Sequence, residues 1–494
     1  MTSEIQIALD PGAAALLDRL HQAGYAAYAV GGCVRDSLLG LSPHDWDLCT
    51  SATPEETLAL FGEKQCIPTG LQHGTITVKW KGKLYETTTF RTEGTYSDGR
   101  HPDHVEFVPD VKEDLARRDF TINAMAYSAE EGLIDPFGGR DDLAKKIVRA
   151  VGEPERRFEE DALRILRLYR FAARFGFAVE PATGQAAKNL CRHLDCVSAE
   201  RIAEELTRLL AAPKPGAYLE ADILAVVIPE LDKQTLPELR DVIDRLEPGT
   251  EAMPTRLAAL LLPLGEDGAK TALKRLKCSN ALMNTVTTLV CEVRENTLLP
   301  RSRIRRAGSF SEDRPLGWDP VAEGNRAGDG MACNGNDRRQ RRKQGVAVGA
   351  AASGMQGPIS GQSIRWEPQP VFVSEKEAPD SPGKSGIQLD TKRLLGRYGL
   401  EIVEQLNALC GALCPERAAD FAVQAALARQ LDAAGVCCRV SQLAVNGRDL
   451  MAAGIQPGPG LRRVLEALLE QVLTGQTPNE KNALLHAAAE FSAS

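Results

Sequence analysis

The pattern of hydrophobic and polar positions changes character near residue 145. Residues 11–22 place apolar side chains at the spacing of an amphipathic helix, and residues 26–30 form a short apolar run typical of a buried strand. Residues 74–80 and 84–91 are rich in β-branched and aromatic side chains and flank a Lys-Gly-Lys turn, which predicts a hairpin. Alternation over 44–50 predicts a further strand, and helical spacing resumes over 114–128.

Beyond residue 145 the helical period dominates, except between residues 301 and 386. That stretch is rich in Gly, Asn, Gln and Arg, and it holds too few apolar residues to offset the entropy lost on ordering. We interpret it as a disordered insertion. Its basic cluster at 338–343 indicates either a solvated linker, which is favoured, or a patch that touches RNA.

The fold class predicted from these patterns is an α+β head followed by all-α domains. The expected boundaries are a head at 1–145, a helical neck at 146–212, a helical body at 213–300, the insertion at 301–386 and a helical tail at 387–494.

Composition narrows the function classes. Aromatic residues at 5% argue against a β-sandwich or propeller, and a net charge of -8 argues against a polycation that coats nucleic acid, so any RNA contact must use local basic patches. Twelve cysteines without a C-x-x-C pair do not suggest a zinc site. The N-terminus has no basic region ahead of an apolar core, and no apolar run approaches the roughly 20 residues of a membrane span, so we expect a cytoplasmic protein with no membrane partner.

The stretch from Gly31 to Glu56, GGCVRDSLLGLSPHDWDLCTSATPEE, combines several features of a nucleotide site. Two glycines precede a helix start, where backbone N–H groups can approach phosphate oxygens, and Arg35 adds a cation one turn later. On the predicted strand Asp45 and Asp47 project from one face and can jointly hold a divalent cation. Alone, the two aspartates would indicate only a solvated strand; the combination favours nucleotidyl transfer.

Glu86 lies on the predicted hairpin and has two interpretations. It is either a third carboxylate near the metal ions or a cross-strand partner of Lys79 or Lys81.

Five motifs in order resemble the class II tRNA nucleotidyltransferase and poly(A) polymerase family, whose head is of the polymerase-β-like type. They are the stretch at 31–56, RRDFTINAMAY at 117–127, DPFGGRDDL at 135–143, EDALRILRLYRFAARFGF at 160–177 and SAERIAEEL at 198–206. The resemblance implies an enzyme that needs Mg²⁺ and uses no nucleic-acid template.

The resemblance also implies residue roles. Asp45 and Asp47 would bind Mg²⁺, while Gly32 and Arg35 would hold the phosphates of the nucleotide. Arg118 would contact the nucleotide in a motif associated with ribose selection. The nucleotide-selecting helix would carry Asp161, Arg164, Arg167 and Arg170.

The spacing of the last four residues predicts that they lie along one side of a helix, with Arg170 somewhat offset. An aspartate can accept a hydrogen bond from an exocyclic amine and an arginine can donate to ring acceptors, a pairing that suits both cytosine and adenine. The alternative for this stretch taken alone is a salt-bridged surface helix.

Within the family, the loop at 91–108 resembles that of members that add a complete CCA end, and residues 443–473 resemble the tail of bacterial members that meets the tRNA elbow. The expected partners are therefore tRNA, at its acceptor end and elbow, with CTP and ATP. An A-adding enzyme or poly(A) polymerase is the alternative, a non-catalytic tRNA-binding protein is less favoured, and the oligomeric state is left open.

Overall fold

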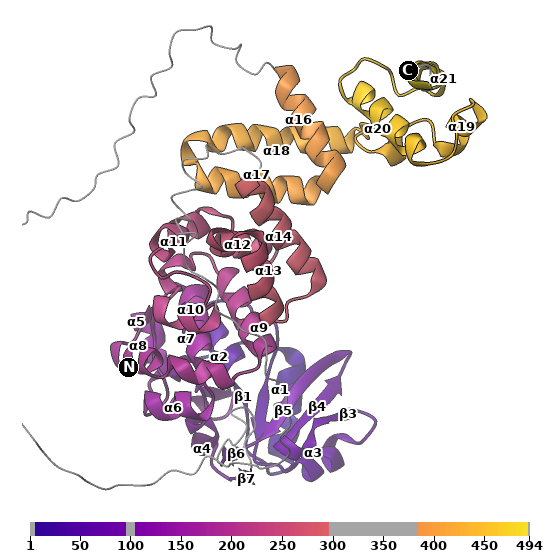
Figure 1. Cartoon of the computed structure of the whole chain (residues 1–494). Coiled ribbons are helices and arrows are strands. Elements are labelled where there is room, and N and C mark those ends of the chain that lie inside the picture. The colour runs from indigo at the N-terminus through magenta and orange to yellow at the C-terminus, as the bar shows by residue number, and fades with distance from the viewer. Residues whose placement is uncertain (1–4, 95–103, 296–383, 493–494) are drawn as a thin grey trace, which may run out of the picture. The chain divides into compact units, whose positions relative to one another are not determined.

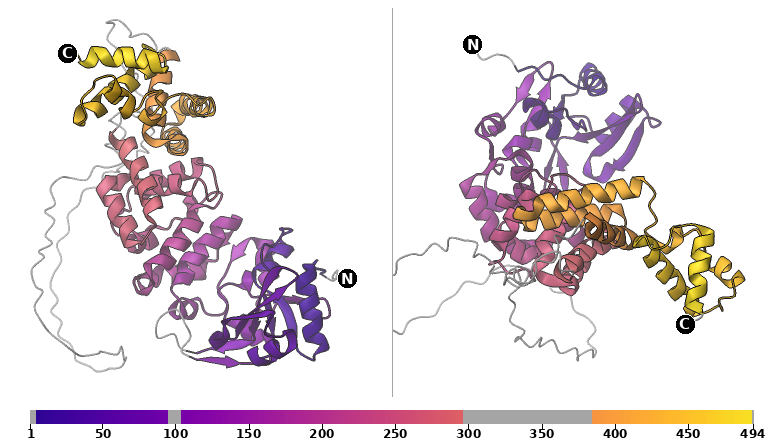
Figure 2. Two further views of the ribbon diagram at one scale, coloured as in Figure 1. Left: turned by 90° about the vertical axis from the view of Figure 1, so that its right-hand side faces the viewer. Right: turned by 90° about the horizontal axis from the view of Figure 1, so that it is seen from above.

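The computed structural model describes residues 5–94, 104–295 and 384–492 (Figure 1). Nearly all of the predicted insertion lies outside the described residues. The centre of the predicted loop, residues 95–103, also lies outside them. Figure 2 shows the same elements from two further sides.

A seven-stranded mixed sheet forms the N-terminal part. The strand patterns predict four of its strands, but not the three at residues 66–70, 126–128 and 132–134. The strand order is β3-β4-β5-β2-β1-β8-β9. Its strands are β1 (Ala27–Val30), β2 (Leu48–Thr50), β3 (Cys66–Gly70), β4 (Thr75–Trp80), β5 (Lys83–Thr89), β8 (Ala126–Ser128) and β9 (Gly132–Ile134). The central strand β1 pairs antiparallel with both β2 and β8, while β2 pairs parallel with β5.

Short helices flank this sheet. They are α1 (Pro11–Gln22), α2 (Gly32–Leu38), α3 (Pro54–Phe61), α4 (Val111–Ala116) and α5 (Gly139–Lys145). Helix α1 matches its prediction residue for residue and buries Leu16, Leu17 and Leu20, which recur at helical spacing. A separate ribbon of β6 (Arg91–Glu93) and β7 (Val105–Phe107) borders the residues that are not described.

The helix predicted over 114–128 is wrong beyond its first turn. Helix α4 ends at Ala116, a 3-10 turn spans Thr121–Asn123, and residues 126–128 form β8 instead. All three residues of β8 are buried, and the strand hydrogen-bonds to β1 on one side and β9 on the other. Pairing on both edges with full burial therefore outweighs the helical spacing of this apolar segment.

Helices follow the head, as predicted. A parallel pair of two-residue strands, β10 (Ile147–Val148) and β11 (Ala178–Val179), brackets the first of them. The helices are α6 (Pro154–Glu160), α7 (Leu163–Phe175), α8 (Pro181–Asn189), α9 (Ala199–Leu210), α10 (Ala221–Val227), α11 (Leu236–Arg245), α12 (Met253–Leu261), α13 (Gly265–Arg275) and α14 (Asn280–Glu295).

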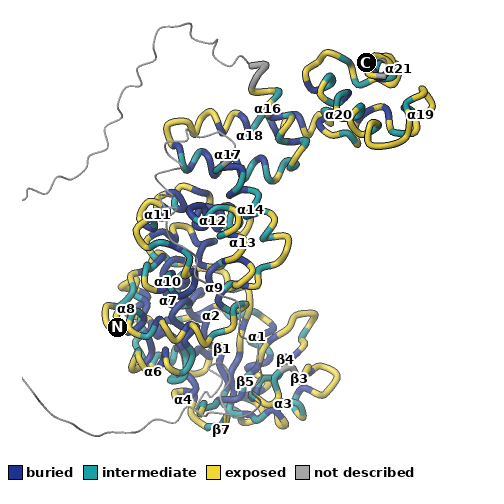
Figure 3. The backbone as a smooth tube through the Cα atoms, in the orientation of Figure 1, coloured by how far each residue is buried: buried dark blue, intermediate teal, exposed yellow. Residues whose placement is uncertain are grey.

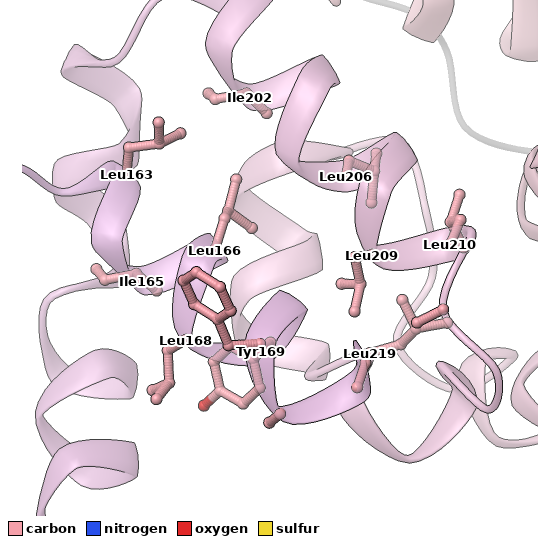
Figure 4. Close-up of a cluster of buried hydrophobic side chains, with 14 of the residues drawn as sticks. Leu163, Ile165, Leu166, Leu168, Tyr169, Ile202, Leu206, Leu209, Leu210 and Leu219 are labelled. Carbon is pink, nitrogen blue, oxygen red and sulfur yellow. The ribbon is translucent and has the colours of Figure 1, made fainter. Parts of the chain in front are cut away.

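Helices α7 and α9 share an apolar interface that fixes the orientation of α7. Leu166 and Tyr169 of α7 pack near Leu206 and Leu209 of α9 (Figure 4). All four are buried, and the burial map shows α7 as one of the most enclosed segments of the chain (Figure 3). Because this core holds α7 in one orientation, the positions of its arginines are set by the fold.

The C-terminal segment is helical, with α16 (Lys384–Tyr398), α17 (Leu400–Leu413), α18 (Ala418–Ala433), α19 (Gly447–Ala452), α20 (Pro459–Leu473) and α21 (Lys481–Ser492). Helix α16 begins three residues before the predicted tail. Across the described parts of the chain, no helix combines the length and the apolar character that crossing a membrane requires.

Candidate active site

The carboxylates Asp45 and Asp47 lie just before strand β2, which begins only at Leu48. The predicted strand over 44–50 is therefore shorter than expected, although the carbonyl of Asp47 still accepts a hydrogen bond from the amide of Val30 at 2.9 Å. Trp46 is buried while both aspartates are exposed, so the alternation that placed them on one face holds in this extended segment.

Glu86 is brought beside Asp47 by strand register. In the parallel pairing of β2 with β5, Leu48 lies opposite Thr87, so Asp47 and Glu86 each directly precede a paired residue. Across the hairpin Glu86 faces Thr77, whereas Lys79 faces Leu84. The register thus favours the interpretation of Glu86 as a neighbour of the aspartates over a cross-strand partner of Lys79.

The charges of these carboxylates interact. Partial desolvation by surrounding protein atoms raises the pKa of Asp47, the charge of Glu86 raises it further, Arg118 opposes the rise and Asp45 adds to it. A divalent cation among these oxygens would relieve the repulsion, and carboxylate oxygens are the donors that hard cations prefer. Within the described ranges no three His, Cys, Asp or Glu side chains already form a metal-binding group. These carboxylates fit a divalent ion such as Mg²⁺, which takes oxygen ligands and draws the rest of its ligands from water or from substrate phosphates.

Gly31 and Arg118 lie together just before helix α2. Gly31 has a φ of +77°, and a Cβ there would lie 2.8 Å from Nη1 of Arg118. Helix α2 then begins at Gly32, and no side chain caps its first N–H groups. Arg118 donates to the buried Asp114 at 3.3 Å, and within the described part of the chain its buried Nε–H finds no acceptor. Backbone donors and a cation therefore meet at one place, as anion binding requires.

Arg35 is held beneath helix α2. It is 4% exposed, donates to Asp36 at 2.8 Å and to Asn123, and its guanidinium lies 4.9 Å from the ring centre of Phe175. In this conformation the guanidinium is paired with Asp36, and its Nη2 would lie 3.6 Å from a Cβ on Gly32, so it stands close to the start of α2. The sequence places Arg35 correctly near the glycines but gives no sign of these partners.

Asp161 lies outside the helix on which the spacing places it. The chain breaks between α6 and α7, and Asp161 is extended, with φ -146° and ψ 103°. One carboxylate oxygen accepts from the amide of Leu163 at 3.0 Å and the other pairs with Arg201 at 2.7 Å. The prediction that four residues share one side of a single helix is therefore wrong for Asp161, because its side chain caps the turn that enters α7.

The three predicted arginines of α7 each meet a carboxylate. Arg164 donates to Glu160 at 2.7 Å, Arg167 donates twice to Asp119 at 2.6 and 2.9 Å, and Arg170 donates to Glu205 at 2.5 Å. Arg167 remains 33% exposed by side chain, whereas Arg170 is 9% exposed. Arg164 also donates to the carbonyl of Arg117 and so joins α7 to the motif that holds Arg118.

Sequence reasoning missed the carboxylates that hold these arginines, above all Asp119. Burial raises the pKa of Asp119, but the charge of Arg167 and hydrogen bonds from Asn123 and Arg167 outweigh it and lower the pKa to about 2. The available signal was its place directly after Arg118 in the second motif. Glu205 offered a similar signal in the fifth motif, at a position that is 4% exposed.

Comparisons with known proteins agree with these motifs. The family model described as poly A polymerase head domain matches residues 27–149. A model of domain 2 of tRNA nucleotidyltransferases matches residues 388–488, and one for an RNA- and SrmB-binding segment of polymerase A matches residues 176–235.

Among curated relatives, a CCA-adding enzyme of Limosilactobacillus fermentum is 33% identical over 482 residues, covering 96% of each chain. A CCA-adding enzyme of Lactobacillus delbrueckii subsp. bulgaricus is 43% identical over 281 residues, covering 56% of this chain and 70% of its own.

Solved structures share the fold. The Bacillus stearothermophilus CCA-adding enzyme in complex with CTP matches with a TM-score of 0.65 and 26% identity over 98% of both chains. The Thermotoga maritima CCA-adding enzyme complexed with tRNA matches in fold, with a TM-score of 0.56 and 18% identity over 99% of this chain and all of its own. Together with the near-complete alignment to the L. fermentum protein, these findings show that the chain belongs to the family of CCA-adding enzymes.

Proposed function

We infer that this chain adds and repairs the 3′-terminal CCA of tRNA, using CTP and ATP and releasing pyrophosphate. The observation that carries the inference is the alignment along 96% of both chains with a CCA-adding enzyme. Curated relatives and a solved neighbour bear the same name, and solved complexes of such enzymes contain CTP or tRNA. CTP, ATP and tRNA are the partners of this reaction.

The reaction needs a divalent metal, and we propose Mg²⁺ held by Asp45 and Asp47. When bound, such ions activate the attacking 3′-hydroxyl and neutralise the charge of the leaving pyrophosphate. Glu86 is the proposed third carboxylate, supported by its register beside Asp47 and by its effect on the pKa of that residue. All three side chains lie on exposed positions.

The triphosphate would bind where Gly32 begins helix α2. The uncapped N–H groups there donate to phosphate oxygens, and the positive φ of Gly31 lets the backbone approach closely. Arg118 stands against Gly31 and would contact the nucleotide directly. Arg35 would add its positive charge near Gly32, at the start of α2.

Base selection is assigned to Asp161 and Arg164, with Arg167 and Arg170 behind them. Asp161 would accept from the exocyclic amine of cytosine or adenine, and Arg164 would donate to the neighbouring ring acceptor. In the nucleotide-free chain these groups pair with Arg201 and Glu160. Nucleotide binding would therefore exchange protein partners for base partners at little net cost.

The proposed domains keep the predicted limits: a catalytic head to residue 145, a neck to 212, a body to 300 and a tRNA-binding tail from 387. The tail assignment is supported by the family model that matches residues 388–488.

Two alternatives make different products. An A-adding enzyme or poly(A) polymerase would incorporate only adenosines, whereas the relatives found carry the CCA-adding name. A non-catalytic tRNA-binding protein would not need Asp45, Asp47, Arg118, Asp161 and Arg164 together, all of which are present.

The metal assignment is tested by replacing both aspartates in D45A/D47A and measuring incorporation of labelled CTP and ATP into tRNA that lacks CCA. We expect incorporation to fall by at least about a thousandfold, since an oxygen cage for the ion is lost, while tRNA affinity is retained. The matched control is Asp222→Ala, which removes an exposed carboxylate paired with Lys233 elsewhere. Incorporation at the control's rate by the double variant would refute the assignment.

A further inference from the structure

A cavity of about 420 Å³ lies between the C-terminal ends of α7 and α9 and the start of α12. None of the three proposed metal-binding carboxylates lines it. Its lining combines basic, hydroxyl and apolar side chains and no acidic one: Arg170, Arg174, Thr207, Arg208, Ala211, Ala212, Pro213, Thr250 and Met253. In a chain whose net charge is -8, an acid-free pocket with three arginines is a local exception. The composition suits an anion joined to an apolar or aromatic group.

Arg208 can change partners at low cost. Its side chain is 56% exposed and pairs with the equally exposed Glu204 one turn earlier, and exposed pairs of this kind contribute at most about 1 kcal/mol. The side chain of Arg174 is 44% exposed and pairs at 3.3 Å with the buried Asp36, which keeps Arg35 as a partner at 2.7 Å if Arg174 turns to another anion. Arg170, by contrast, is held by Glu205 in the wall of the pocket.

A fourth arginine supports the pocket from behind. Arg256 of α12 is 0% exposed and donates to the carbonyls of Leu210, Ala212, Pro213 and Leu246. These bonds fix the segment that lines the pocket. Burial lowers the pKa of Arg256, yet a guanidinium keeps its proton in proteins, and here its acceptors are neutral carbonyls. The charges of Asp244 and Glu247 act against that of Arg256, so its contribution to the pocket is to hold the wall in place.

Helix α7 links this pocket to the proposed base-selecting residues. Arg164 and Arg174 are ten residues apart on α7, which corresponds to about 15 Å along a helix that rises about 1.5 Å per residue. Stacked nucleotides of one strand advance by about 3.4 Å, so this distance spans four or five of them. A strand whose 3′ end lies near Arg164 would place an earlier phosphate within reach of the pocket.

We propose that this pocket binds a phosphodiester of the tRNA acceptor strand, a few nucleotides before the 3′ end that is being extended. Arg174 and Arg208 hold the phosphate, and the adjoining sugar or base lies against Met253 and Pro213. The inference rests on the proposed function, because the strand is the substrate of that reaction. It assigns the pocket to the RNA, not to the incoming nucleotide.

The test is the affinity of Arg208→Ala for tRNA that lacks CCA, measured over a series of salt concentrations. We expect the Kd to rise about tenfold, as for loss of one charge-assisted hydrogen bond, and the slope of log K against log salt to fall by about 1. The KM for CTP and the melting temperature should stay unchanged. Arg208→Lys should retain most of the affinity. Arg192→Ala, which removes an exposed arginine outside the pocket, should bind tRNA like the wild type.

A second measurement locates the phosphate. Methylphosphonate linkages are introduced one at a time into the acceptor strand, and one position should weaken binding to the wild type but not further weaken binding to Arg208→Ala. Loss of tRNA affinity in Arg208→Ala that adds to every methylphosphonate would overturn the proposal, since Arg208 would then act elsewhere.

The outcomes separate this inference from the proposed function. If the wild type does not extend tRNA, the proposed function fails. If it does extend tRNA but Arg208→Ala binds tRNA like Arg192→Ala, only the pocket assignment fails. The pocket would instead belong to a free nucleotide if the wild type bound two CTP molecules, Arg208→Ala bound one, and both had the same affinity for tRNA. That result would equally overturn the proposal.

Discussion

Asp119 is the residue whose replacement tests most sharply how the head is joined to α7. One carboxylate oxygen accepts from the amide of Phe120 at 2.8 Å and from Asn123 at 3.0 Å, and the other accepts two bonds from Arg167. In Asp119→Asn the volume is kept, but an NH₂ group replaces one oxygen. Either the donors of Arg167 or those of Phe120 and Asn123 then face another donor.

The magnitude follows from the acidity of Asp119. Its pKa falls from an ordinary value of 3.8 to about 2 in the folded protein. Because a tenfold change in acidity corresponds to about 1.4 kcal/mol, the ionised form contributes about 2 to 3 kcal/mol to the free energy of unfolding. A carboxyl with a lowered folded pKa stabilises the protein above its unfolded pKa. This contribution is therefore full at pH 7 and is lost as the pH falls from about 4 to about 2.

The assay is calorimetric melting of wild type and Asp119→Asn between pH 7 and pH 3. At pH 7 we expect the variant's transition to be lower by about 5 to 10 °C, given 2 to 4 °C per kcal/mol for a cooperative unit of 150 to 250 residues. The difference should shrink toward pH 3. Asp222→Asn, in an exposed pair with Lys233, should shift the transition little at any pH. Equal melting of Asp119→Asn and wild type at pH 7, or a difference that does not vary with pH, would refute the reasoning.

Three further predictions concern packing and metal binding. Arg256→Met should lower the free energy of unfolding by about 3 kcal/mol or more, because four carbonyls lose their donor and three of these hydrogen bonds are buried. Arg462→Met, with a side chain 86% exposed, should be neutral in the same urea titration. Gly139→Ala should abolish soluble folded protein, since its Cβ would lie 2.2 Å from the carbonyl oxygen of Thr121. Gly460→Ala, with open space around it, should express normally. Equal yields of the two variants would contradict the steric argument. The Mg²⁺ concentration for half-maximal incorporation should rise as the pH is lowered toward the pKa of Asp47, because protons compete with the ion at this carboxylate, whose pKa is raised by desolvation and by Glu86. An activation constant that stays the same down to the lowest pH at which the enzyme remains folded would count against Asp47 as a ligand.

Much of the fold could be predicted from the sequence, because several segments have one clear period. Helix α1, strand β1 and the β4-β5 hairpin lie where the hydrophobic pattern places them. Strand β8 could not be predicted in this way. Its apolar residues fit a helix as well as a strand, and only pairing with β1 and β9, from distant parts of the chain, decides between them.

The candidate site shows the same division. The aspartates and glycines could be placed together because they lie within one short stretch, Gly31 to Asp47. The proximity of Glu86 depends on the parallel register of β2 with β5, and the partner of Arg167 comes from 48 residues earlier. Such long-range pairs leave no periodic signal in a single sequence. The helix break at Asp161 could not be predicted, because an aspartate three residues before Arg164 fits the spacing of a helix whether it lies within the helix or just before its start.

The central claim is tested most directly by the lengths of the products that the purified chain makes on tRNA lacking CCA. With Mg²⁺ and both nucleotides we expect extension by three residues; with CTP alone, by two; and with ATP alone, none. Supplying ATP to tRNA that already ends in CC should add one residue and stop. Extension by adenosines alone, beyond one residue or without prior CTP, would contradict the account.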